Sequence, residues 1–228
     1  MIRPPRRKLR PGAAAYLAAA KPAPGTSWLS ARWCVVDLEL SGLDPRRNEI
    51  VSFGATPIEH GRIQLADAVS GLVRPSEPLS ESSILIHGIR PDDLVDAPEL
   101  DAAIDPLLAA MAGRVLVAHV AEVERAFLGV ALRRQRLRLS GPIVDSEVIG
   151  RLWLCERDGA VPPKRPLAEL AYALGLPADR QHDALGDALT AAQVFLAAAT
   201  HLDALKSETV RSLARARHRL DAAVTYRS

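Results

Sequence analysis

The sequence predicts an α/β protein in which one mixed sheet carries helices on both faces. Short β-branched apolar runs dominate the first part of the domain, and segments with helical spacing of apolar residues dominate the rest. The predicted order, β-β-β-α-β-α-β-α-α, describes a sheet of three antiparallel strands followed by parallel ones. A length of 228 residues, with 48% apolar and 25% charged side chains, suits one domain plus extensions. This composition excludes a disordered, collagen-like or disulfide-framework chain.

Three extended segments open the domain. Residues 33–40 (W-C-V-V-D-L-E-L) form a nearly continuous apolar run, which is typical of a buried strand, and the turn S-G-L-D-P follows. Residues 49–59 and 62–74 lie on either side of His60 and Gly61. They predict a hairpin that extends the sheet with antiparallel strands.

Helices and short strands alternate after this point. The spacing of apolar residues predicts a helix over 98–112 that ends at Gly113, a strand over 114–119 and a helix over about 121–136. A strand at 143–145 leads into a helix that begins near Ser146. Further helices are expected at about 167–174, 184–199 and 202–223.

We expect three parts along the chain: a basic, flexible extension over 1–30, the domain over 31–200, and an amphipathic basic helix over 201–228. The extension either is solvated or contacts phosphate or anionic lipid through Arg3, Arg6, Arg7, Lys8 and Arg10. The C-terminal helix either exposes its arginines to solvent or docks a partner or nucleic acid; these are Arg211, Arg215, Arg217 and Arg219.

Charge and cysteine content narrow the compartment and the partners. The net charge of +2 gives no global field toward nucleic acid, so any such contact must be local. Cys34 and Cys155 lie far apart and lack the spacing of a zinc site. Pro22 and Pro24 interrupt the Ala-rich N-terminal region, so we expect no signal peptide, and no run reaches the roughly 18 apolar residues of a membrane span. We therefore expect a cytoplasmic protein without a membrane partner.

The first acidic motif lies at the end of the first strand. Asp37 and Glu39 are two residues apart, so both side chains project from the same face of the sheet. Two adjacent carboxylates repel unless a cation lies between them. That cation is either an arginine side chain or a divalent metal ion, which prefers oxygen ligands.

Two further motifs carry acids and histidines at element boundaries. A strand ends at His119 and the next helix carries Glu122 and Glu124, which are either ordinary solvated acids at a helix start or groups that reach the strand end. His182 lies on a loop before a helix that carries Asp183 as an N-cap and Asp187 one turn later. A loop histidine beside an inward-facing acid is a candidate general base.

Together these motifs resemble those of the proofreading-type DEDDh 3′→5′ exonucleases, the family like the epsilon subunit of DNA polymerase III. The matching segments are D-L-E-L-S-G-L at 37–43, H-V-A-E-V-E-R-A-F-L at 119–128, and His182, Ala184, Asp187 and Ala188 in the pattern H-x-A-x-x-D-A. I-H-G-I at 86–89 and V-D-S at 144–146 also fit, and the resemblance covers about residues 32–200. The chain departs from the pattern at three positions: Leu40 replaces a threonine, Val120 an asparagine and Glu124 an aspartate.

The resemblance implies a ribonuclease-H-like fold and a phosphodiester hydrolase with two divalent cations, Mg²⁺ or Mn²⁺. It implies that Asp37, Glu39, Glu124 and Asp187 hold the metal ions and that His182 takes a proton from the attacking water. Leu40, His87 and His119 occupy positions of substrate contact, although His87 is equally a turn histidine and His119 a structural residue at a strand tip. Asp145 is expected to cap the following helix.

The resemblance also implies the substrate and leaves alternatives open. We expect release of nucleoside 5′-monophosphates from the 3′ end of single-stranded DNA, with a polymerase or repair protein as partner. Arginines outside the acidic site would guide the strand; the candidates are Arg133, Arg134, Arg136 and Arg138. The alternatives are an exoribonuclease, or a degenerate domain that binds nucleic acid or a polymerase without efficient cleavage.

Overall fold

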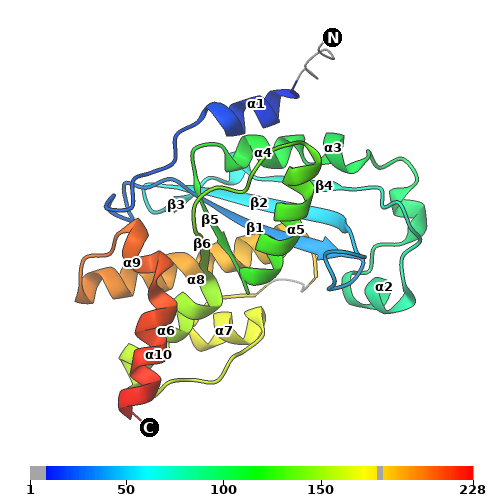
Figure 1. The fold of residues 1–228 in the computed structure, drawn as a ribbon. Coiled ribbons are helices and arrows are strands. Elements are labelled where there is room, and N and C mark those ends of the chain that lie inside the picture. The colour runs from blue at the N-terminus through cyan, green and yellow to red at the C-terminus, as the bar shows by residue number, and fades with distance from the viewer. Residues whose placement is uncertain (1–8, 179–181, 228) are drawn as a thin grey trace.

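The computed structural model describes residues 9–178 and 182–227 and shows a six-stranded mixed sheet between layers of helices (Figure 1). The central strand β1 (Trp33–Leu40) pairs antiparallel with β2 (Ile50–Glu59) and parallel with β5 (Val115–Ala118). Strand β6 (Ile143–Asp145) pairs parallel with β5. Strands β3 (Arg62–Ile63) and β4 (Val69–Leu72) both pair antiparallel with β2. The parallel strands therefore end on the same side of the sheet as the acidic end of β1.

The predicted third strand is two strands in the structure. A short 3₁₀ helix, η1 (Leu65–Asp67), separates β3 from β4. Across from this interruption, β2 contains Pro57, which has no N–H to donate to a neighbouring strand. Only Thr56 and Pro57 separate the two paired stretches of β2, whereas residues 64–68 separate β3 from β4. The extra residues between β3 and β4 therefore cannot pair with β2, and they form the turn that contains η1.

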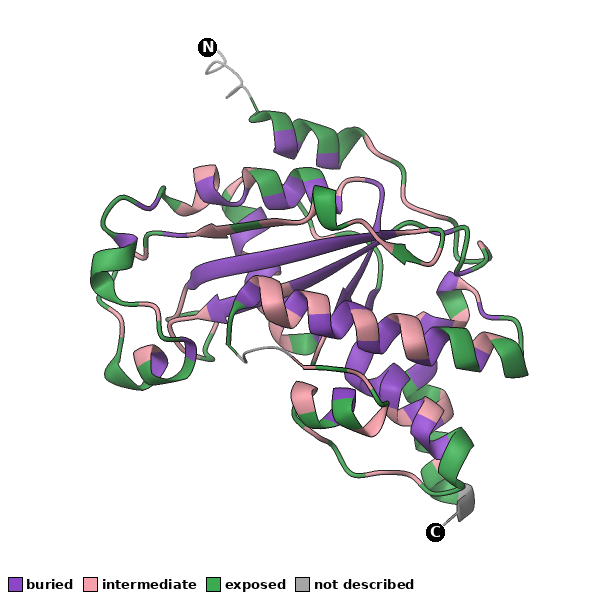
Figure 2. Ribbon diagram, turned by 180° about the vertical axis from the view of Figure 1, so that it is seen from behind, coloured by how far each residue is buried: buried purple, intermediate pink, exposed green. Residues whose placement is uncertain are grey.

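The two faces of the sheet bury different sets of helices (Figure 2). Residues of β1 alternate between the faces, and both faces are buried, as expected for a central strand. Cys34, Val36 and Leu38 pack with α4 (Asp105–Met111) and α5 (Glu122–Arg134). Trp33 and Val35 pack with α6 (Ser146–Asp158) and α8 (Ala184–Leu205). The smaller helices are α2 (Glu81–His87), η2 (Pro91–Leu94) and α7 (Leu167–Ala173).

The predicted helix over 98–112 is broken at Ile104 into α3 (Leu100–Ala103) and α4. Pro106 stands in the first turn of α4, where its missing N–H is tolerated, and it cannot continue a preceding helix. The carboxylate of Asp105 accepts hydrogen bonds from the backbone N–H groups of Gly12 and Ala13, at 3.0 and 2.9 Å. A long-range contact therefore accompanies the break.

The segment from residue 9 to 30, expected to be flexible, packs on the domain. Helix α1 (Pro11–Ala18) lies against α4 and buries Ala13 and Tyr16. Trp28 is also buried, and its carbonyl accepts a 2.8 Å hydrogen bond from Nε1 of Trp33. Small residues on α1 allow this close approach. The basic residues Arg3, Arg6, Arg7 and Lys8 lie outside the described residues.

The C-terminal part also differs from the prediction. Helix α8 continues to Leu205, and the expected helix over 202–223 is instead a break followed by α9 (Val210–Ala214) and α10 (Ala216–Arg227). The break has local causes: Asp203 accepts a hydrogen bond from the Glu208 N–H, and Thr209 caps α9 through the Ser212 N–H. By length and composition α8 could cross a membrane, but half of its most apolar window is buried, as in a core helix.

Candidate active site

Strand β1 places Asp37 and Glu39 on the sheet face that α8 covers. Asp37 pairs in register with Gly54 of β2. A Cβ atom at Gly54 would overlap the carbonyl group of Ala184, the first residue of α8. Glycine therefore lets the start of α8 lie directly on the sheet beside the two acids. A lone glycine inside the apolar strand was the sequence signal for this close approach, and the sequence analysis missed it.

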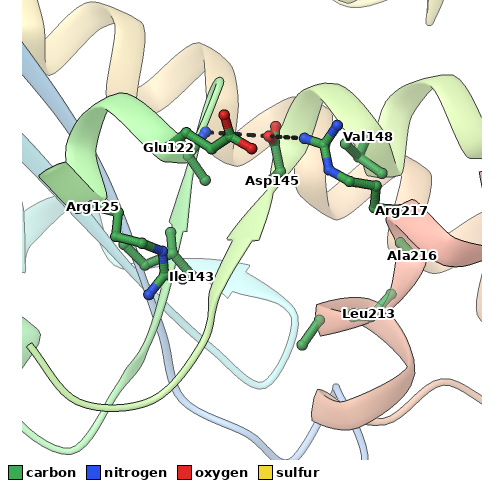
Figure 3. A pocket seen from close by; sticks show the side chains of 10 residues that line it. Glu122, Arg125, Ile143, Asp145, Val148, Leu213, Ala216 and Arg217 are labelled. Carbon is green, nitrogen blue, oxygen red and sulfur yellow. Dashed lines mark hydrogen bonds and ion pairs between the residues drawn. The ribbon is translucent and has the colours of Figure 1, made fainter.

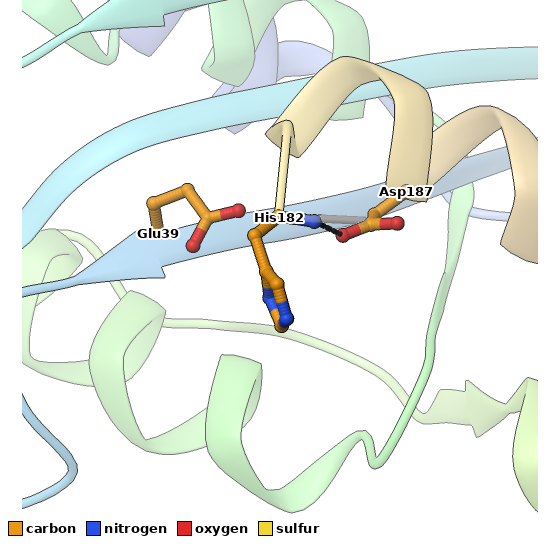
Figure 4. Close-up of side chains that lie close together, drawn as sticks. All are labelled: Glu39, His182 and Asp187. Carbon is orange, nitrogen blue, oxygen red and sulfur yellow. Dashed lines mark hydrogen bonds between the residues drawn. The ribbon is translucent and has the colours of Figure 1, made fainter. Parts of the chain in front are cut away.

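The first turn of α8 carries Asp187, and the loop before it carries His182; both lie beside Glu39 of β1 (Figure 4). Asp183 caps the helix, as predicted, by accepting a 3.1 Å hydrogen bond from the Gly186 N–H. Asp187 accepts a 2.8 Å hydrogen bond from the His182 N–H. One ligand atom each from Glu39, His182 and Asp187 lies within 4.8 Å of the others. Glu39 and His182, which are 143 positions apart in sequence, thus belong to one cluster.

Glu124 reaches the same region from the other side of the sheet. It lies in the first turn of α5, its residue is only 5% exposed, and its Oε2 atom is buried without a hydrogen-bond partner. Among the charged neighbours that perturb Asp37, Glu124 acts most strongly, ahead of Asp187 and Glu39. Glu124 is therefore not a solvated acid at a helix start.

All four carboxyl groups have raised pKa values. Burial raises the pKa of Asp37 well above its usual range, and the neighbouring carboxylates raise it further. Burial, followed by the charges of Asp187 and Asp183, raises the pKa of Glu39 to about 7. Burial raises the pKa of Glu124 to about 8. The pKa of Asp187 is raised by burial despite the opposing effect of the His182 N–H.

The cation expected between Asp37 and Glu39 is not an arginine in this structure. Within residues 9–178 and 182–227, no lysine or arginine forms an ion pair with Asp37, Glu39, Glu124 or Asp187. Buried acids that repel one another and an orphaned carboxylate oxygen fit a site for divalent cations. The donor set is mainly carboxylate oxygen, which suits Mg²⁺ or Mn²⁺ better than zinc.

Two of the three predicted substrate contacts lie near this cluster. Leu40 is the partly buried last residue of β1. His87 is buried at the end of α2; its Nδ1 accepts a 3.0 Å hydrogen bond from the Ile89 N–H, and its Nε2 is buried without a partner. Burial lowers the pKa of His87, and the charge of His182 lowers it further. A neutral His87 that accepts at Nδ1 presents an Nε2–H donor.

The third predicted contact, His119, makes a structural interaction. Its Nδ1 lies 3.2 Å from the hydroxyl oxygen of Ser146 on α6. Burial lowers the pKa of its imidazole, although the Asp145 carboxylate opposes this. His119 therefore links the end of β5 to the start of α6.

Asp145 caps α6 as predicted, and it does more. It accepts a 3.0 Å hydrogen bond from the Glu147 N–H, and it also accepts the N–H groups of Val120 and Ala121, each at 3.2 Å. Arg217 from α10 completes its contacts.

Val120 has a positive φ of 58°, a left-handed conformation that asparagine adopts more readily than a β-branched residue. This explains physically why valine is an unusual choice at this position.

A protein-family comparison decides the classification. The model of the RNase T family, described as "Exonuclease", matches residues 34–195, which include every element of the acidic cluster. The chain belongs to this exonuclease family. The predicted membership among the proofreading-type DEDDh exonucleases is thereby confirmed.

Relatives of this exonuclease domain include proteins named as DNA polymerase III. The chain is 31% identical over 172 residues to a PolC-type DNA polymerase III of Thermotoga petrophila, covering 75% of this chain and 12% of that protein. It is 32% identical over 169 residues to a DNA polymerase III subunit epsilon-like protein of Rhodobacter capsulatus, covering 71% of this chain and 23% of that protein. The chain thus spans less than a quarter of the length of either relative.

Solved structures share the fold of this exonuclease domain. E. coli exonuclease I in complex with a dA16 oligonucleotide aligns with a TM-score of 0.64 at 17% identity, covering 76% of this chain and 42% of that one. Exonuclease X in complex with 5′ overhanging duplex DNA aligns with a TM-score of 0.57 at 19% identity, covering 81% and 98%. At these identities the likeness concerns the fold, and it confirms the predicted ribonuclease-H-like sheet with helices on both faces.

Proposed function

We propose that this domain is a metal-dependent 3′→5′ exonuclease that releases nucleoside 5′-monophosphates from the ends of single-stranded DNA. The observation that carries the proposal is the gathering of Asp37, Glu39, Glu124 and Asp187 beside His182, with raised pKa values and, within the described residues, no ion pair to a lysine or arginine. Such a site repels a phosphodiester until its charge is neutralised. Metal binding and substrate binding are therefore expected to be coupled.

The carboxylates divide into two groups that suit two divalent cations, Mg²⁺ or Mn²⁺. Glu39 and Asp187 lie together and would hold one ion, while Glu124 would hold the other from the opposite face of the sheet. The charges of both groups raise the pKa of Asp37, which would contribute to both ions. When bound, such a pair of cations stabilises the attacking and leaving oxygens of a phosphoryl displacement.

His182 is placed to act as the general base. Its backbone is held by Asp187, and its side chain is exposed beside Glu39. An imidazole accepts a proton near neutral pH, which is what deprotonation of an attacking water requires. The backbone hydrogen bond orients the histidine without using its ring nitrogens.

The strand end would meet the uncharged groups around this cluster. The Nε2–H of His87 supplies a buried donor that a nucleotide oxygen or base edge can satisfy, and Leu40 supplies an apolar surface. His119 would act on the substrate only through the turn that it anchors. The exposed arginines near the end of α5 would contact the phosphates of the departing strand: Arg133, Arg134, Arg136 and Arg138.

The decisive experiment measures release of labelled nucleotides from single-stranded DNA and RNA of the same sequence, labelled at the 3′ or the 5′ end. Mg²⁺, Mn²⁺ and EDTA are compared. We expect metal-dependent loss of 3′-terminal nucleotides from DNA at the higher rate. Faster RNA cleavage would make the domain an exoribonuclease, and tight DNA binding without release would make it a degenerate binding module.

Paired variants on one helical turn test the site itself. Glu124→Gln keeps the size of the side chain but removes its charge, and we expect it to abolish most activity. Glu122→Gln changes an exposed residue of the same turn and serves as the matched control. Equal activity of the two variants would show that Glu124 does not serve the reaction.

We also propose a polymerase or repair protein as partner and the cytoplasm as the place of action. The support is the similarity to domains within proteins named as DNA polymerase III. Size-exclusion chromatography of the chain with the purified replicative polymerase of its own source tests this. Separate elution at micromolar concentrations would contradict a stable complex.

A further inference from the structure

The carboxylate of Asp145 joins three elements at one point, beside a pocket of about 180 Å³ (Figure 3). Its side chain is 12% exposed at the end of β6. Oδ1 accepts from the N–H groups of Val120 and Glu147, and Oδ2 accepts from the Ala121 N–H and from Nη2 of Arg217, at 3.0–3.2 Å. The end of β5, the start of α6 and the C-terminal helix α10 therefore share one acceptor.

The β5–α5 turn depends on this distant acceptor. The N-cap residue of α5, Ala121, has no side chain that could cap the helix. Val120 is also held at a φ of 58°, which its own conformational preference disfavours. Asp145 accepts the N–H groups of the two residues just before the helix, Val120 and Ala121. The position of the first turn of α5, which carries Glu124, is thus set from β6.

Arg217 pairs with Asp145 and so links this carboxylate to α10. Helix α10 packs on α6, burying Ala216 and Leu220. It is tied to the preceding break by Arg219, which pairs at 2.6 Å with the buried carboxylate of Glu208. Arg217 therefore projects from a helix whose position is fixed by these contacts.

The pocket shows why the ion pair matters for α5. Its walls include Glu122 and Arg125 of α5 on one side, and Leu213 and Ala216 of the C-terminal helices on the other. Where this pocket separates them, the two sides are not packed together. The Arg217–Asp145 pair bridges the α10 side to the amides that begin α5.

We propose that Arg217 is a positioning residue for the acidic site: through Asp145 it holds the β5–α5 turn and so sets Glu124 relative to Asp37. This inference rests on the proposed function, because it assigns Glu124 to metal binding. Arg217 itself touches neither substrate nor metal. Without it, the Asp145 carboxylate loses the contact that fixes its Oδ2 atom, so its side chain gains freedom to move and no longer holds the two turn amides in one position.

The test compares Arg217→Ala with Arg215→Ala, which removes an exposed arginine one residue before α10 begins. Full-length proteins are titrated with Mn²⁺ by calorimetry, and amide hydrogen exchange is followed at residues 119–124. Loss of a residue that orients a metal ligand lowers metal affinity or activity about 10-fold or more. We expect a decrease of this size in Mn²⁺ affinity for Arg217→Ala. We also expect a fall in kcat with little change in KM. We expect faster exchange at 119–124 as well, and Arg215→Ala should match the wild type.

Two further variants separate positioning from general stability. Arg217→Lys keeps a donor and a charge, so it should recover part of the Mn²⁺ affinity. Asp145→Asn should reproduce the effects of Arg217→Ala, and the double variant should add little to either single one. Mn²⁺ affinity and exchange rates that are the same in Arg217→Ala and Arg215→Ala would overturn the proposal. So would a loss of affinity that merely follows the melting temperature of the metal-free proteins.

Failure of the proposed function would look different. A wild-type protein that binds Mn²⁺ but hydrolyses no nucleic acid would refute the exonuclease activity. The comparison of Mn²⁺ affinities would still decide the role of Arg217. A wild-type protein that binds no Mn²⁺ would overturn both.

Discussion

Val120→Asn should stabilise the metal-free protein. Val120 has a φ of 58° and is 47% exposed. A left-handed conformation costs a residue other than glycine about 1–3 kcal/mol, and a β-branched side chain lies toward the upper part of that range. Asparagine tolerates this region, so the substitution should release about 1.5 kcal/mol of that cost.

The lost valine contacts reduce this gain. Complete burial of a valine side chain stabilises a protein by roughly 1.5 kcal/mol, and about half of the Val120 surface is buried, so the loss is about 0.7 kcal/mol. The net gain is therefore about 0.5–1 kcal/mol. For a chain of this length, that corresponds to a melting temperature about 1–4 °C higher. The amide that Asp145 accepts remains in place.

Differential scanning calorimetry in EDTA measures this shift. The matched control is Val95→Asn, because Val95 is 64% exposed and has an ordinary φ of −56°. The same chemical change there relieves no backbone cost, so we expect no rise in the melting temperature. The reasoning is refuted if Val120→Asn lowers the melting temperature as much as Val95→Asn does.

Three further predictions follow from the site. Because burial raises the pKa of Glu124 from 4.5 to about 8, the folded metal-free protein binds more protons than the unfolded chain between these values. Its stability in EDTA, measured by urea unfolding, should therefore fall as pH rises from about 5 to about 8, and Glu124→Gln should flatten this slope. Stability that rises over this range would contradict the raised pKa of Glu124. Gly54→Ala should destabilise the protein by about 1–3 kcal/mol and lower nuclease activity, because the added Cβ overlaps the Ala184 carbonyl. The control is Gly129→Ala on α5, where there is room for a Cβ, and this variant should be neutral or stabilising in the same thermal melts. His182→Ala should slow single-turnover hydrolysis by roughly 10²–10⁴-fold while largely sparing Mn²⁺ affinity, and an unchanged rate would remove His182 as the base.

Local sequence was enough to predict the elements whose cause is local. The apolar run of β1 specified a central strand, and strand alternation placed Asp37 and Glu39 on one face without any knowledge of the neighbours. Asp183 and Asp145 were identified as caps because a cap acts on amides two or three residues away. The motif pattern also predicted the family, and the family comparison confirms that classification.

The tertiary structure decided where distant segments meet. The break at Ile104, the split between β3 and β4 and the end of α8 at Leu205 all interrupt segments that periodicity alone would continue. Periodicity reports which face of a segment is apolar, but not whether a partner elsewhere in the chain bends or ends that segment. Residues 9–30 looked like an extension because their helix has little amphipathic pattern; they pack because α4 offers a matching surface.

The site depends on tertiary structure in the same way. The local sequence alone leaves open whether Glu124 is a solvated acid at a helix start, and only the motif resemblance assigns it to the site. The packing of α5 on the sheet is what buries it near Asp37. Asp145 and Arg217 are 72 residues apart, and no local pattern links them. Spacing along the chain determines which side chains share a face over a few residues. Contacts between elements depend on register, loop closure and packing of the whole fold, and these set the charge, burial and position of every acid in the site.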